Sequence, residues 1–65
     1  MRTPQEEAQN IIADNVLPFT TGIELAQSYA DCFKDATAKL DAAKPMEQEH
    51  WQEVLDCLRK LINHV

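Results

Sequence analysis

The short segment Ala43-Lys44-Pro45 is the feature that most constrains how this chain can fold. It separates two long amphipathic patterns, at about residues 22–43 and 46–64, and its proline cannot continue a helix that precedes it. Two helices joined by so few residues must fold back antiparallel on each other. The sequence therefore predicts a long helical hairpin.

A third, shorter helix is expected before the hairpin, at about residues 4–16. Thr3 is followed by Pro4 and then by Glu6, an order typical of a capping threonine, a proline in the first turn and a glutamate that bonds back to the cap. Pro18 disfavours helical geometry in the residue before it, so this helix must end near residue 16. A helix of about three turns is not stable alone in water and must pack against the hairpin.

The bend between the first two helices contains the aromatic residue Phe19, which we expect to anchor it. Thr21, Gly22 and Glu24 then repeat the capping pattern, with threonine at the cap and glutamate three positions later. The second helix is therefore expected to begin at residue 22.

Both long helices carry apolar arcs that are wider than one neighbouring helix can cover. At 100° per residue, the arc of the second helix extends over about half of its circumference, and that of the third helix is similarly broad. We predict an all-α fold in which two hairpins pair into a homodimer resembling a four-helix bundle, with the first helix covering an end or flank. The alternative is a monomeric three-helix bundle, in which the first helix fills the groove between the other two. The residues expected at the dimer or partner interface are Tyr29, Phe33, Leu40, Trp51, Leu55, Leu58 and Ile62.

The histidines and cysteines do not predict a metal site. His50, Cys57 and His64 are spaced seven residues apart, which is a rise of ~10.5 Å along a helix, whereas ligands of one zinc ion lie within a few ångströms of each other. Antiparallel pairing places Cys32 opposite Cys57. The pair could be two small apolar side chains or could form a disulfide, and the sequence leaves this open. No metal or other cofactor is expected.

Composition excludes several classes of function. With 11 acidic and 6 basic residues, the net charge of −5 repels nucleic acid and anionic membranes. No apolar run approaches the ~20 residues of a membrane span or the core of a signal peptide, so we expect a soluble cytoplasmic protein. The second helix opens without a basic residue, which also argues against a DNA-binding helix-turn-helix. No residue pattern indicates an enzyme or a small-molecule substrate.

The short capped helix and the acidic hairpin around Pro45-Met46-Glu47-Gln48-Glu49-His50-Trp51 resemble those of the very small helical accessory proteins of temperate (lambdoid) phage early regions. This resemblance implies a non-enzymatic protein that binds and modulates a host regulator, and it carries over no site residues. We therefore expect a homodimeric regulator or adaptor that acts through protein–protein contact. The alternative is an acidic inhibitor that mimics nucleic acid and blocks a DNA- or RNA-binding protein.

Overall fold

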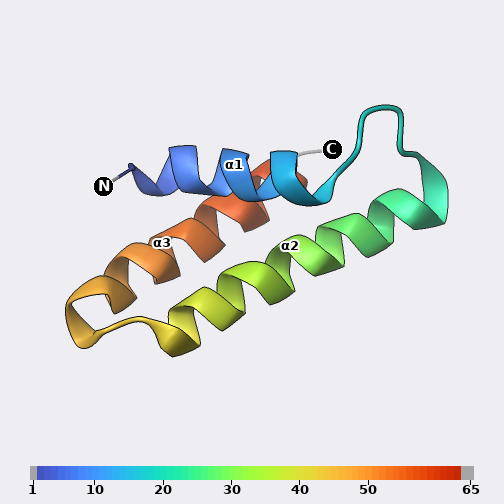
Figure 1. Cartoon of the computed structure of the whole chain (residues 1–65). Coiled ribbons are helices and arrows are strands. Elements are labelled where there is room, and N and C mark those ends of the chain that lie inside the picture. Colours follow the sequence, from blue (N-terminus) through green and yellow to red (C-terminus); the bar gives the residue numbers. More distant parts are fainter. Residues whose placement is uncertain (1, 64–65) are drawn as a thin grey trace.

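The computed structural model describes residues 2–63, which form three helices and no strand. They are α1 (Pro4–Asn15), α2 (Gly22–Ala42) and α3 (Pro45–Ile62) (Figure 1). The all-α fold class predicted from the sequence is confirmed. The expected end of the third helix, at residue 64, lies outside the described residues. Within residues 2–63, no helix combines the length and apolar character needed to cross a bilayer.

The first two helices begin in different ways. At α1, the hydroxyl oxygen of Thr3 accepts a hydrogen bond from the backbone N–H of Glu6 at 3.2 Å, as the sequence predicts for a cap. At α2, the side chain of Thr21 makes no capping bond, so the predicted capping box is wrong there. Gly22 instead has a φ of +64°, a conformation that glycine adopts without strain. The backbone freedom of this glycine allows the chain to turn into α2.

The hinge between α2 and α3 consists of Ala43 and Lys44, both in extended backbone geometry. The proline ring disfavours helical geometry at Lys44 and is itself suited to the first helical position, so α3 begins at Pro45, one residue earlier than expected. Figure 1 shows α2 and α3 running in opposite directions from this hinge. The two helices pack against each other along the hairpin.

α1 packs against both helices of the hairpin. Within one chain it therefore takes the position expected in the alternative three-helix arrangement, along one side of the hairpin. The described part of the chain is elongated, with extents of 37 × 18 × 17 Å. The length of α2 determines this shape, because 21 residues at about 1.5 Å each span roughly 30 Å.

The core is small and lies where the three helices meet. Its fully buried residues are Ala8, Ile11, Cys32, Ala36, Val54 and Leu58. On α2 the buried line is formed by Cys32 and Ala36, whereas Tyr29 and Phe33 are only partly buried. Small side chains on the buried line allow α1 to approach the α2 backbone closely, and two aromatic rings would hold it farther away. The most deeply buried residues of α2 are thus small ones, and the two aromatic residues expected at an interface are not among them.

Candidate protein-binding surfaces

The predicted interface residues divide into two groups in the structure. Leu58 is fully buried within the chain, so a second molecule cannot contact its side chain without opening the fold. The others retain partial exposure: Tyr29, Phe33 and Leu40 on α2, and Trp51, Leu55 and Ile62 on α3. Leu58 is therefore a core residue, and the remaining six are the ones a partner could reach.

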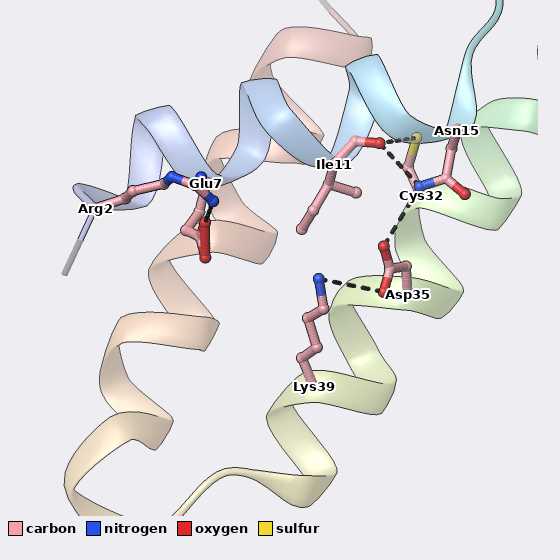
Figure 2. Close-up of polar contacts among 7 residues, drawn as sticks. All are labelled: Arg2, Glu7, Ile11, Asn15, Cys32, Asp35 and Lys39. Carbon is pink, nitrogen blue, oxygen red and sulfur yellow. Dashed lines mark hydrogen bonds and ion pairs between the residues drawn. The ribbon is translucent and has the colours of Figure 1, made fainter.

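One side of the hairpin is covered by α1 and bonded to it (Figure 2). The thiol of Cys32 donates to the backbone carbonyl oxygen of Ile11 at 3.8 Å, and the side-chain amide of Asn15 donates to a carboxylate oxygen of Asp35 at 3.4 Å. Asp35 also forms an ion pair with the ammonium nitrogen of Lys39 at 3.5 Å. These contacts show which side of α2 faces α1.

The ammonium group of Lys39 continues this set of contacts to α3. It lies 5.6 Å from the centroid of the Trp51 ring, within range of a cation–π interaction. The imidazole of His50 packs edge-on against the same ring, with centroids 5.2 Å apart. Trp51, one of the expected interface residues, is thus already in contact with Lys39 and His50 within the chain, which makes it a weak candidate for an anchor to a partner.

Among residues 2–63, no third helix covers the opposite side of the hairpin. At 100° per residue, Phe33 lies about 200° around α2 from Asp35, the residue bonded to α1. On α3, Leu55 lies about 200° from Cys57, which lines a surface groove together with Gln5 of α1. Phe33 and Leu55 thus lie on a different side of their helices from Asp35 and Cys57. We call the surface formed by Ala26, Ala30, Phe33, Leu55 and Ile62 the hairpin flank, in which both alanines are exposed.

The two cysteines occupy different environments and are free thiols. Cys32 is fully buried, and this burial raises the pKa of its thiol, with the carboxylates of Asp35 and Asp31 contributing further in the same direction. Because the thiolate is the reactive form, Cys32 is chemically quiet at neutral pH. Cys57 is partly exposed.

The described part of the chain contains no candidate metal-binding site. No three His, Cys, Asp or Glu side chains among residues 2–63 are grouped so that they could hold one ion. His64, the third member of the heptad-spaced set, lies outside the described residues. The Nε2 atom of His50 is buried without a hydrogen-bond partner among residues 2–63 and is not part of such a group.

The connection between α1 and α2 exposes several large apolar side chains. Leu17 is 73% exposed, Phe19 is 100% exposed and Ile23, at the start of α2, is 78% exposed. Figure 1 shows this connection standing away from the three helices. The expectation that Phe19 anchors the bend is wrong, since its ring contacts nothing that would shield it. We call residues 17–23 the apolar loop.

Phe19 also has an unusual backbone conformation. The segment Leu17-Pro18-Phe19-Thr20 is closed by a hydrogen bond from the backbone N–H of Thr20 to the carbonyl oxygen of Leu17 at 3.3 Å, and the Thr20 hydroxyl donates to the same oxygen at 2.7 Å. Phe19 has a φ of +67° in this turn. Proline followed by a residue with positive φ is the signature of a type II turn, which prefers glycine or asparagine at the second position. A bulky phenylalanine there is strained, and its fully exposed ring makes no packing contact among residues 2–63 that would offset the strain.

Sequence reasoning missed this loop because it treated an aromatic residue at a bend as a buried anchor. The available signal was the turn chemistry: Leu-Pro-Phe-Thr has proline at the position that type II turns favour, but lacks glycine at the next one.

Comparisons with protein-family models, with curated proteins and with solved structures found no match to this chain.

Proposed function

We propose that this protein is a protein–protein interaction module that forms a homodimer through the hairpin flank and acts as a regulator or adaptor. The single observation that carries the proposal is the incomplete burial of the apolar side of the hairpin opposite α1. Phe33, Leu55 and Ile62 pack against the core but remain partly exposed, with Ala26 and Ala30 open beside them.

The size of the core supports this proposal. Of the six fully buried residues, two are alanines and one is cysteine, and the largest is Leu58. A chain of 65 residues buries a smaller share of its surface than a larger domain and commonly gains stability by oligomerisation. Pairing two hairpin flanks would cover the half-exposed side chains of both copies in one self-complementary contact.

The chemistry of the flank suits helix–helix contact. Ala26 and Phe33 are seven residues apart, so they lie on nearly the same line of α2, two turns from each other. Exposed alanines allow a second helix backbone to approach closely, and the neighbouring rings and aliphatic chains provide apolar contact area. We therefore place α2 of each copy at the centre of the dimer.

Sedimentation velocity across a range of concentrations tests the proposal. The wild-type chain should sediment as a dimer at tens of micromolar and dissociate on dilution. Ala26→Glu should shift the equilibrium to the monomer, because the exposed methyl group would be replaced by a charge in the contact. Circular dichroism should show unchanged helix content, since Ala26 is exposed in the monomer.

Ala38→Glu is the matched control. Ala38 lies on the same helix, is also exposed, and is about 140° away from Phe33 around the helix axis. This variant should dimerise like the wild type. A monomeric wild type at tens of micromolar, or equal effects of the two substitutions, would refute dimerisation through the flank.

A further inference from the structure

We infer that the apolar loop is a second binding surface, separate from the hairpin flank. It binds another protein that presents an apolar pocket with a basic rim. Phe19 would be the anchor that enters the pocket, with Leu17 and Ile23 covering its edge. This inference goes beyond the proposed dimer and does not require it. It depends on three independent features of the loop: its exposure, its strained turn and its charge.

Exposure and strain together indicate an anchor. A single exposed large apolar residue is common on protein surfaces, but three within seven residues concentrate apolar surface on one connection. The strained residue is also the most exposed of the three, at 100%. The turn therefore holds the ring in the solvent at a free-energy cost to the isolated chain, and a rigidly presented aromatic ring is the type of residue that dominates binding energy at interfaces.

Charge identifies the kind of partner. No Lys, Arg or His occurs between Arg2 and Lys34, and the helix ends that frame the loop carry the exposed carboxylates of Asp14 and Glu24. Neither carboxylate takes part in an ion pair among residues 2–63. Arg2 pairs with Glu7 at 3.0 Å, in the first turns of α1 and away from the loop (Figure 2). Exposed apolar side chains that are flanked along the chain by carboxylates complement an apolar pocket with Lys or Arg at its rim.

The same charges disfavour the other occupants of an apolar loop. An anionic membrane would repel Asp14 and Glu24, and the loop lacks the basic residues with which membrane-surface segments bind lipid headgroups. Two apolar loops from two copies of this chain would bring four carboxylates together. A protein with a basic rim is the occupant that satisfies both the apolar and the charged part of the surface.

Selection from a displayed library of random peptides tests this inference directly. The wild-type chain is the bait, with counter-selection against Phe19→Asn. Asparagine tolerates positive φ, so this variant keeps the turn and removes the ring. The selected peptides should combine apolar residues with Lys or Arg. One of them, made synthetically, should bind the wild type at least about tenfold more tightly than Phe19→Asn.

Met46→Asn is the matched control for the loss of exposed apolar surface. Met46 is 92% exposed but lies at the opposite end of the hairpin, beside the hinge. Its substitution should leave peptide affinity within about twofold of the wild type. The neutral double variant Asp14→Asn with Glu24→Gln should bind the peptide more weakly and with a shallower dependence on salt between 50 and 500 mM, because screening acts on the charged part of the contact.

Several results would overturn the inference. These are a selection that yields no Phe19-dependent peptide, selected peptides without an excess of basic residues, or equal binding by Phe19→Asn. Phe19-dependent binding to vesicles of phosphatidylcholine, alone or with phosphatidylglycerol, would identify a membrane as the occupant instead. A change in the sedimentation of Phe19→Asn would identify a second copy. Peptide binding by the monomeric Ala26→Glu variant separates this test from that of the dimer, since either can fail alone.

Discussion

Replacing Phe19 with glycine should stabilise the isolated chain, although glycine usually destabilises a protein. Phe19 has a φ of +67°, a left-handed conformation that costs a non-glycine residue about 1–2 kcal/mol. Its side chain is 100% exposed, so removing the ring deletes no packing. Glycine also makes the unfolded chain more flexible, and this offsets about 0.5–1 kcal/mol of the gain in the free energy of unfolding. The net expectation is an increase of about 0.5–1 kcal/mol in the free energy of unfolding.

Urea denaturation followed by circular dichroism at 222 nm measures this change, with all variants at one protein concentration so that any self-association is held constant. With a slope of about 1 kcal/mol per molar urea, typical of the smallest domains, the midpoint should rise by roughly 0.5–1 M. Gly22→Ala should shift the midpoint in the opposite direction. Gly22 has a φ of +64° with open space around its α-carbon, so alanine there adds strain without a clash. A loss of stability in Phe19→Gly would refute the reasoning, because it would mean that the ring is packed or its backbone relaxed.

Three further predictions concern the core and the caps. Leu58→Ala should lower the free energy of unfolding by about 2–5 kcal/mol in the same urea assay, because it leaves a cavity at the largest fully buried side chain. Thr3→Ala should cost about 1 kcal/mol and reduce helicity, since it removes the acceptor of the Glu6 N–H bond; an unchanged midpoint would show that water replaces this cap. Burial raises the pKa of Cys32, so its titration should not affect the free energy of unfolding at neutral pH. As the pH rises past about 9, the thiol of the unfolded chain loses its proton before that of the folded chain, and the free energy of unfolding should fall. Cys32→Val should remove that component of the pH dependence, and a thiol reagent should modify Cys57 in the native wild type well before Cys32, whereas equal rates would contradict the burial of Cys32.

The helices and the hairpin could be predicted because their signals are local. The cap at Thr3 and the proline at the first position of α3 each act within one turn of the helix they begin. The described helix ends lie within one residue of expectation at Asn15 and Ala42, where Pro18 and the hinge interrupt the pattern. The expected end of the third helix at residue 64 lies outside the described residues.

The buried face of α2 could not be predicted because the competing choices were equally apolar. One line of α2 runs through Tyr29 and Phe33, and a neighbouring one runs through Cys32 and Ala36. Which of them is buried depends on where α1 packs. That packing is set by contacts between residues about 20 positions apart, and the sequence near either residue does not indicate it. Burial statistics do not separate the two lines, because cysteine, alanine and phenylalanine are all commonly buried, whereas the close approach of two helices favours the line with small side chains.

The strain at Phe19 links the fold to the proposed use of the apolar loop. A substitution that stabilises the free chain is expected to weaken binding when the original residue is held in place for a partner, because functional sites retain conformations that the isolated protein disfavours. Phe19→Gly should therefore raise the free energy of unfolding and lower affinity for a selected basic peptide, while Met46→Asn should do neither, although Met46 is almost as exposed. If both effects appear at position 19 and neither appears at position 46, exposure alone cannot explain the loop. If Phe19→Gly raises the free energy of unfolding without lowering affinity for the peptide, the strained ring does not enter the pocket.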